Sequence, residues 1–305
     1  MSADIKSRND LRSGFVSVVG RTNVGKSTLV NAIVGEKVAI VTPKPQTTRN
    51  VIRGIYNDKR GQIVFMDTPG LHKPRTRMNE TMVRQAMDSI RSVDAVLWLL
   101  DATALWKDEE ERLFAALREA GRPVVIAINQ IDRLKNKSLA LPLIAELSQK
   151  AQGWPVYPMS ALNKADIPGL LDLLFPLLPM GEPLFPEEVY TDQMERQLVA
   201  EIVREQVFAR TREEVPHCAG VLVESFHEAK EEGGRVVIHC SILVERESQK
   251  PIVIGRGGQN LKAIGTAARQ EMQRLLGCPV ELRLFVKVHP NWRDNPQILR
   301  EMGLG

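Results

Sequence analysis

The sequence predicts an α/β fold with a mostly parallel sheet, followed by a smaller α+β unit. Short runs rich in Val and Ile alternate with amphipathic segments from residue 15 to residue 179, the pattern of βαβ units around a parallel sheet. Residues 176–188, PLLPMGEPLFPEE, then place four prolines and a glycine in thirteen positions, which interrupts helices and strands alike. We therefore expect a first domain at 1–180, a linker at 181–190 and a second domain at 191–305.

Hydrophobic periodicity divides each domain into elements. DAVLWLLDA, residues 94–102, is apolar on both faces, as expected of a central parallel strand covered by helices. For the first domain we expect strands at 15–19, 51–56, 62–66, 94–100, 123–128 and 155–158, and helices at 27–34, 79–91, 108–120, 138–150 and 167–175. For the second domain we expect a helix at 191–209, strands at 219–226 and 235–245, a β-rich apolar lead-in at 251–260, a helix at 260–276 and a strand at 279–288.

Composition and cysteine content argue against several classes of protein. The chain has 305 residues, 43% hydrophobic and 26% charged, which is typical of a globular protein. Its apolar runs are far shorter than the roughly twenty residues of a membrane-spanning helix. Its first ten residues are charged and lack the apolar core of a secretory signal, so we expect a cytoplasmic protein. Cys218, Cys240 and Cys278 lie far apart without C-x-x-C spacing, so we expect reduced thiols rather than disulfides or a zinc site.

Charge is distributed unevenly along the second domain. Residues 181–249 hold 7 basic and 15 acidic side chains, whereas residues 250–287 hold 7 basic and 2 acidic ones. An anionic partner would therefore meet the second of these stretches.

A motif near the N-terminus has the spacing G-x(4)-G-K-S. In GRTNVGKS, residues 20–27, the glycines let the backbone curl so that several N–H groups converge on a phosphate at the start of a helix. Lys26 can reach the β and γ phosphates, and Ser27 offers a hydroxyl to Mg²⁺. The residues predicted to contact a nucleotide here are Gly20, Asn23, Val24, Gly25, Lys26, Ser27 and Thr28. The alternative, an incidental glycine turn, is disfavoured because a predicted strand precedes the motif and a helix follows it.

Three later motifs each follow a predicted strand. In MDTPG, Asp67 could hold Mg²⁺ through water and the Gly70 N–H could reach a γ-phosphate. In INQID, Asp132 could accept the N1 and N2 hydrogens of guanine, which adenine lacks, and in MSALNK the Ala161 N–H could bond the guanine O6. The residues predicted to surround the base are Asn129, Gln130, Asp132, Ser160, Ala161 and Leu162. Each motif alone fits an ordinary turn, but open α/β sheets bind ligands at this carboxyl edge.

In this order, GRTNVGKS, QTTRN, DTPG, NQID and SAL resemble the five boxes of translation-factor-type GTPases over residues 13–180. The resemblance implies a P-loop GTPase domain with a six-stranded sheet, GTP and GDP as ligands, and switch segments at 46–50 and from Asp67 to His72 onward. It implies Ser27, Thr48 and Asp67 as Mg²⁺ ligands, with Thr47 an alternative to Thr48, and Lys26, Thr48 and Gly70 as catalytic residues. The chain departs from the family at Gln130, where a lysine normally covers the guanine ring.

Hydrolysis is expected to be slow. Ras-type enzymes place a water-orienting Gln directly after D-x-x-G, but Leu71 occupies that position and can neither donate nor accept a proton. Arg49, Arg75 and Arg77 are unranked candidates for an arginine finger. Similar GTPases with Asn at the position of Asn23 often use K⁺ for the missing charge, so we hypothesise K⁺ stimulation. The alternative for Asn23 is a turn-favouring residue without a ligand role.

The second domain carries a G-x-x-G loop in PIVIGRGGQNLK. Its α-β-β-α-β order, with the loop before the last helix, resembles the type II KH module, in which glycines let a nucleic-acid backbone come close. The predicted RNA-binding residues are Gly255, Arg256, Gly257, Gly258, Lys262 and Arg269. Ile254, Leu261 and Ile264 are expected to form an apolar floor for bases. For the charges, an ordinary solvated helix face is the alternative.

A GTPase domain followed by one KH module, with KPQTTRN and IGRGGQNLK as the more specific motifs, resembles the Era family of ribosome-assembly GTPases along nearly the whole chain. The resemblance implies a GTP-regulated protein that binds the 3′ region of 16S rRNA and acts on the 30S subunit. It also implies a monomer without DNA binding, in the cytoplasm and in part peripheral at the inner membrane. Trp292 in the tail is expected to pack against the module, with RNA contact as the alternative.

Two other functions are compatible with parts of the sequence. A constitutive RNA-binding protein could retain a decayed nucleotide fold, but Lys26, Ser27, Asp67 and Asp132 are all intact. An ATP-dependent phosphotransferase would leave Asp132 and Ala161 without a role. Affinities for GTP, GDP and ATP distinguish these alternatives.

Overall fold

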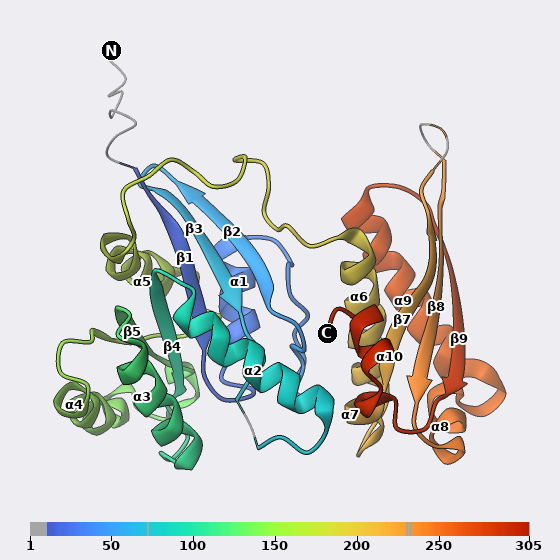
Figure 1. The fold of residues 1–305 in the computed structure, drawn as a ribbon, viewed down its shortest axis with the longest axis horizontal. Coiled ribbons are helices and arrows are strands. Elements are labelled where there is room, and N and C mark those ends of the chain that lie inside the picture. The colour runs from blue at the N-terminus through green and yellow to red at the C-terminus, as the bar shows by residue number, and fades with distance from the viewer. Residues whose placement is uncertain (1–10, 72, 230, 232–233, 305) are drawn as a thin grey trace. The chain divides into compact units, whose positions relative to one another are not determined.

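A computed structural model describes residues 11–71, 73–229, 231 and 234–304 (Figure 1). The chain forms two compact units. The first comprises the residues up to Ala39, Thr48–Lys73 and Met82–Asp192. The second comprises Ile40–Thr47, Pro74–Thr81 and Gln193–Gly305, so two short segments of the N-terminal half pack with the C-terminal part of the chain.

The first unit is built on a six-stranded sheet in the order β2-β3-β1-β4-β5-β6. All neighbouring pairs are parallel except β2 and β3, which form an antiparallel hairpin. The strands are β1 (Arg12–Val19), β2 (Ile52–Asp58), β3 (Gly61–Asp67), β4 (Ala95–Asp101), β5 (Val124–Asn129) and β6 (Val156–Pro158). Because β3, β1, β4, β5 and β6 are parallel neighbours, the phosphate loop and the three later motifs meet at one edge of the sheet.

Helices cover both faces of this sheet, as the alternation of β4 requires (Figure 1). Leu97 and Leu99 pack on the side of α1 and α5, whereas Trp98 and Leu100 pack on the side of α2, α3 and α4. The helices are α1 (Lys26–Val34), α2 (Arg77–Arg91), α3 (Asp108–Ala120), α4 (Leu141–Lys150) and α5 (Ile167–Leu174). From Ala95 to Leu100, β4 has no polar position on either face, so this part of the strand lies inside the unit.

The proline-rich segment after α5 runs beside the hairpin of the first unit. The Tyr190 carbonyl accepts the Ile55 N–H at 2.9 Å, and the Gln62 Oε1 accepts the N–H groups of Leu184 and Phe185 at 2.8 and 3.0 Å. The stretch expected to link the domains is therefore hydrogen-bonded to the first unit.

The second unit packs helices on one face of a three-stranded sheet in the order β7-β8-β9. β7 and β8 are antiparallel, and β8 and β9 are parallel. Its elements are α6 (Glu195–Arg210), α7 (Val215–Cys218), β7 (Gly220–His227), β8 (Val236–Val244), α8 (Lys250–Ile254), α9 (Gln259–Leu276), β9 (Val280–Val288) and α10 (Pro296–Glu301). Together the two units confirm the predicted fold class.

The β-rich lead-in was a wrong prediction. Residues 250–254 form the helix α8, with Pro251 in its first turn and Val253 fully buried. Pro suits the first turn of a helix because an N–H there has no intrahelical acceptor, so the missing N–H of Pro costs nothing. This outweighs the strand propensity of the β-branched residues that follow. The short helices α7 and α10 also had no counterpart in the sequence analysis.

Candidate functional site

The phosphate loop, residues 20–27, joins β1 to α1 through strained glycine positions. Gly20 has φ 147°, and a Cβ there would lie 2.4 Å from the Leu99 carbonyl oxygen. Gly25 has φ 95°, and its Cβ would lie 2.4 Å from the Asn129 side-chain nitrogen. Only glycine tolerates both the angle and the approach. The two glycines of the motif are therefore required by the fold of the loop itself.

Lys26 is buried under the loop. Its Nζ donates to the carbonyl oxygens of Gly20 and Arg21 at 3.2 and 2.9 Å. Burial lowers its pKa to about 8 although Asp67 raises it, so the side chain remains mostly cationic at pH 7. A desolvated cation held at the start of a helix suits a phosphate ligand.

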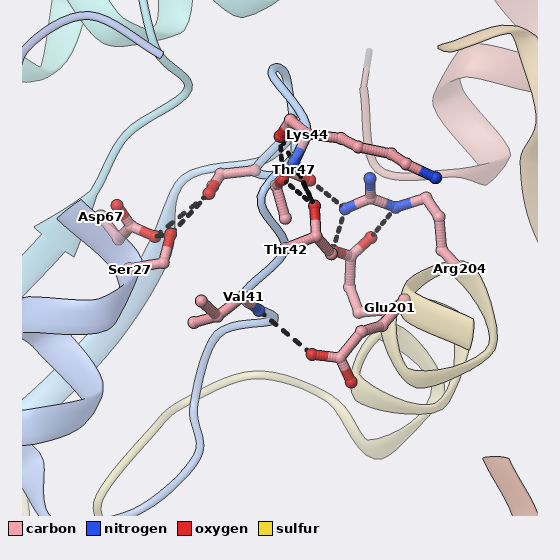
Figure 2. Close-up of polar contacts among 10 residues, drawn as sticks. Ser27, Val41, Thr42, Lys44, Thr47, Asp67, Glu201 and Arg204 are labelled. Carbon is pink, nitrogen blue, oxygen red and sulfur yellow. Dashed lines mark hydrogen bonds and ion pairs between the residues drawn. The ribbon is translucent and has the colours of Figure 1, made fainter. Parts of the chain in front are cut away.

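Three side-chain oxygens from separate motifs meet beside the loop. The Ser27 hydroxyl donates to Asp67 Oδ2 at 2.6 Å and lies 2.8 Å from the Thr48 hydroxyl, which donates to Asp67 Oδ2 at 3.3 Å (Figure 2). Thr47, the alternative from the sequence, instead bonds Thr42 Oγ1 and the Lys44 carbonyl, both at 2.7 Å. The geometry thus brings Thr48 rather than Thr47 to Ser27 and Asp67.

This cluster fits Mg²⁺. Asp67 is fully buried and its Oδ1 has no hydrogen-bond partner among the described residues. Burial raises the pKa of Asp67 to about 6, while Lys26, Ser27 and Thr48 lower it. Among the described residues, no group of three His, Cys, Asp or Glu side chains suits a metal ion. Beside a nucleotide, Mg²⁺ takes its oxygen ligands from few protein side chains, from water and from phosphates.

Asn129 ties the base motifs to the phosphate loop. At the end of β5, its Nδ2 donates to the Val24 carbonyl and its Oδ1 accepts the Ala161 N–H, both at 2.8 Å. The sequence analysis assigned that N–H to the guanine O6. In the structure this N–H donates to Asn129 Oδ1, and its bond to the guanine O6 stays a prediction.

The remaining base-motif residues lie around Asn129. Gln130, with φ 66°, donates from Nε2 to the Asn23 carbonyl at 2.9 Å, and Asp132 is exposed on the following 3-10 turn. Ser160 Oγ accepts the N–H of Leu162, whose side chain is exposed. These positions leave the Asp132 carboxylate accessible to a base.

Gly70 is pressed against the phosphate loop. A Cβ there would lie 2.7 Å from Thr22 Cα, and the Leu71 N–H donates to the Gly20 carbonyl at 3.3 Å. The Leu71 side chain packs against the hydrophobic cluster to which α2 and α3 contribute. Because this side chain is apolar, it supplies no polar group to the site. His72, the end of the predicted second switch, lies outside the described residues.

The three arginine candidates differ in exposure. Arg49 is buried and has partners within the protein, whereas Arg75 and Arg77 are exposed. Arg49 is therefore engaged in structure, and neither exposed arginine is fixed toward the loop by a side-chain contact that the structure gives.

The second unit has a groove between α9 and β9, which we call the α9–β9 groove. Its volume is about 1090 Å³. It is lined by Gly234, Arg235, Gly258, Leu261, Lys262, Gly265, Thr266, Arg269, Gln273, Pro279, Val280, Glu281, Leu282 and Leu284. Of the predicted RNA-binding residues, Gly258, Lys262 and Arg269 line the groove. Arg256 and Gly257 are exposed on the adjoining loop, and Gly255 lies at its start.

The G-x-x-G loop is open on its outer side. Gly257 and Gly258 have φ of 58° and 79°, and a Cβ at either would meet no atom within 4 Å. Gly255 is different, because its Cβ would lie 2.6 Å from Asn260 Cβ. Asn260 Nδ2 in turn donates to the Ile252 and Val253 carbonyls at 3.2 and 3.1 Å, which ties α8 to α9.

Two expectations about the apolar floor need correction, because neither Ile254 nor Ile264 is among the residues that line the groove. Ile264 is fully buried in the core of the second unit, because 264, 268 and 272 form the inner stripe of α9. The floor is instead formed by Leu261 with Leu282 and Leu284 of β9. Thr266 and Gln273 were missed, although their i+4 and i+11 spacing from Lys262 places them on its stripe.

Trp292 packs in the second unit, as expected. It is fully buried, and its Nε1 donates to the Cys218 carbonyl at 2.8 Å. Cys218, Cys240 and Cys278 are free thiols. No helix among the described residues has the length and apolar character needed to cross a membrane.

Comparisons with known proteins agree with both halves of this geometry. A family model described as 50S ribosome-binding GTPase matches residues 15–130, and a KH domain model matches residues 214–293. GTPase Era of Geotalea daltonii is 47% identical over 291 residues, covering 95% of this chain and 97% of that protein. GTPase Era of Heliobacterium modesticaldum is 44% identical over 293 residues, covering 96% and 97%.

The chain belongs to the GTPase Era family. Two solved Era structures share its fold, each 40% identical with a TM-score of 0.92 and covering 97% of this chain. One is a complex with MgGDPNP and nucleotides 1506–1542 of 16S ribosomal RNA, covered to 99%. The other is a variant of Aquifex aeolicus Era bound to GDP and AlF4⁻, covered to 100%. The prediction of an Era-type GTPase is confirmed.

Proposed function

We propose that this chain is a GTP-hydrolysing switch protein that binds 16S rRNA through its KH unit and acts in assembly of the 30S ribosomal subunit. The observation that carries the proposal is the meeting of Ser27, Thr48 and Asp67 beside a buried Lys26, because P-loop GTPases use these groups together to hold a nucleotide-bound Mg²⁺ and its phosphates. The Era complex with MgGDPNP and 16S rRNA supports the same ligands for this chain.

Each residue of the nucleotide site has a separate task. The curled loop offers N–H groups to the phosphates, and Lys26 places a cation beside them. Ser27, Thr48 and Asp67 would hold Mg²⁺, which would offset the negative charge of the phosphates. The Gly70 N–H is a candidate donor to the γ-phosphate, and Asp132 reads the base. Since Leu71 cannot orient a water molecule, we expect slow hydrolysis without an activating partner.

RNA binding is assigned to the α9–β9 groove and its loop. Lys262 and Arg269 supply positive charge, the leucines supply an apolar floor, and the glycines let a backbone approach closely. Glu281 is the single acidic residue among the groove-lining residues and forms ion pairs with Arg235 and Arg283. The groove therefore presents net positive charge to a single strand. The 30S subunit follows from the bound 16S rRNA of the relative, although the broad family name refers to 50S.

Nucleotide titration tests the proposal. We expect tight binding of GTP and GDP and at least hundredfold weaker binding of ATP, because adenine lacks the donors that Asp132 accepts. The variant Asp132→Asn should shift preference from guanosine to xanthosine triphosphate. Comparable ATP affinity would favour an ATP-dependent enzyme instead, and no nucleotide binding would leave a constitutive RNA-binding protein.

Four further properties are proposed on the family resemblance. K⁺ stimulation rests on Asn23, which has φ 64° and whose carbonyl accepts the Gln130 side chain. Equal hydrolysis rates in KCl and NaCl would end that hypothesis. A cytoplasmic location with some peripheral membrane association, a monomeric state and the absence of DNA binding remain predictions, which fractionation, light scattering and competition with duplex DNA would test.

A further inference from the structure

Residues 41–47, the segment before Thr48, are attached to helix α6. The segment belongs to the second unit although it lies in the N-terminal half of the sequence. Its two ends and its middle each bond α6 or the residue that follows it; Figure 2 shows the contacts of Val41 and Thr47. We call these contacts the α6 attachment.

The first two contacts use both the side chains and the C-terminal end of α6. The Val41 N–H donates to Glu205 Oε1 at 3.1 Å. Lys44 Nζ donates to the carbonyl oxygens of Phe208 and Thr211, in the last turn of the helix and just after it. Carbonyls at a helix C-terminus lack intrahelical partners and carry partial negative charge, so an ammonium group is a favourable ligand for them.

The third contact comes from a buried arginine. Arg204 is 2% exposed, and its guanidinium donates to the Thr47 carbonyl and to the Glu201 carboxylate. The same group lies 5.3 Å from the centre of the Phe208 ring. Burying an arginine is costly unless it is paired, and Arg204 Nη1 still has no partner among the described residues. An apolar residue would pack at this position at a lower free-energy cost. We therefore explain the buried charge by its hydrogen bond to the Thr47 carbonyl.

Residues 41–47 are also hydrogen-bonded among themselves. The hydroxyls of Thr42 and Thr47 lie 2.7 Å apart, the Lys44 N–H donates to Thr42 Oγ1 at 3.2 Å, and Gln46 turns the chain with φ 62°. The Thr47 carbonyl and the Thr48 N–H belong to one planar peptide group. Fixing that carbonyl therefore also restricts the backbone of Thr48, whose hydroxyl lies at Ser27 and Asp67.

We propose that α6 positions Thr48 for Mg²⁺-dependent GTP binding and hydrolysis, with Arg204 as the principal positioning residue and Lys44 as the second attachment. This inference rests on the proposed GTPase function. It adds to the reaction a residue that lies outside all five sequence boxes, in the first helix of the RNA-binding unit. Arg204 touches neither reacting atoms nor metal ligands, and acts through the peptide that precedes Thr48.

The test compares Arg204→Met, Arg204→Lys and Lys44→Met with Arg210→Ala. Arg210 lies at the exposed end of the same helix, and its side chain hydrogen-bonds Gln206 alone among the described residues, so it controls for loss of a cation from α6. The readouts are affinity for GDP, affinity for a non-hydrolysable GTP analogue with Mg²⁺, kcat, and hydrogen exchange of residues 41–47 without nucleotide.

We expect Arg204→Met to bind GDP like the wild type but to lose about tenfold in affinity for the GTP analogue and in kcat, as expected for one lost charge-assisted hydrogen bond. Arg204→Lys should recover part of the loss, since an ammonium can still donate to the Thr47 carbonyl. Lys44→Met should show a smaller loss. Exchange at 41–47 should rise in both Met variants and stay unchanged in Arg210→Ala.

Unchanged preference for the GTP analogue over GDP in folded Arg204→Met would overturn the inference while leaving the GTPase function intact. If Arg204→Met fails to fold by circular dichroism, Lys44→Met decides, and wild-type preference and exchange in that variant would overturn the inference. A wild-type protein that binds neither nucleotide would instead refute the proposed function.

Discussion

The nucleotide site and the α9–β9 groove are both proposed to receive phosphates, but they differ in how much of the protein surrounds the ligand groups. Lys26 and Asp67 are buried, and both are hydrogen-bonded to residues of the phosphate loop. Lys262 and Arg269 are exposed on a helix face. Charges act more strongly where water is excluded, so single changes should have large effects in the first site and graded effects in the second.

The largest effect is expected when one cation is removed from the buried site. Lys26→Ala should lower the single-turnover rate of GTP hydrolysis by about a hundredfold or more, because the phosphates lose a desolvated positive charge. Lys59→Ala, which removes an exposed charge from the β2–β3 turn, is the matched control and should hydrolyse GTP at the wild-type rate. A loss below tenfold for Lys26→Ala would mean that the site is as solvent-screened as the groove.

Two glycines with positive φ sharpen the comparison. Gly20→Ala places a Cβ 2.4 Å from a backbone oxygen and should weaken GDP binding by about a hundredfold, since the loop has to move. Gly257→Ala meets no atom within 4 Å and carries only the left-handed backbone strain of about 1 kcal/mol. It should leave GDP binding unchanged and weaken RNA binding severalfold, as measured by calorimetry and filter binding. Equal effects at the two glycines would contradict the difference in packing.

Much of this organisation could be predicted because the nucleotide motifs follow strands that lie together in the sheet. Ser27, Thr48 and Asp67 come from three segments, yet the parallel topology brings β1 and β3 side by side. The choice between Thr47 and Thr48 could not be made from sequence, since adjacent hydroxyls have the same chemistry and only tertiary contacts separate them. Arg204 carries no motif and was invisible for the same reason.

In the second unit, helical periodicity alone predicts which residues of α9 face the core. The inner stripe of α9 contains Ile264, and a count of 3.6 residues per turn already separates it from Lys262. Arg235 is different, because it reaches the groove only through the pairing of β8 with β9, which no local pattern specifies. Helix α8 was missed since its sequence favours a strand until Pro251 is placed in a first turn.

In the open groove, each cation should contribute modestly and in a salt-dependent way. Lys262→Ala and Arg269→Ala should each weaken binding of single-stranded RNA a few-fold at moderate salt. Each should also reduce the slope of log affinity against log salt by about 0.7, the value for one lost phosphate contact on a single strand. Arg274→Ala, on α9 but outside the groove lining, is the control. A slope unchanged in both variants would show that RNA binds elsewhere.

The smallest effect is expected at Gln130, where the family usually has lysine. Gln130→Lys lengthens the aliphatic stem that can cover the base, and burying about one more methylene should tighten GDP binding roughly two- to fourfold. Its ammonium can still donate to the Asn23 carbonyl, as Gln130 does at 2.9 Å, so the loop should keep its geometry.

Pyrophosphate provides the control for that substitution, because it occupies the phosphate loop without a base. If the gain comes from the stem over the ring, pyrophosphate affinity should not change between Gln130→Lys and the wild type in competition against a fluorescent GDP analogue. An equal gain for both ligands would assign the effect to the added charge. The base end would then behave like the exposed cations of the groove rather than like the buried phosphate end of its own site.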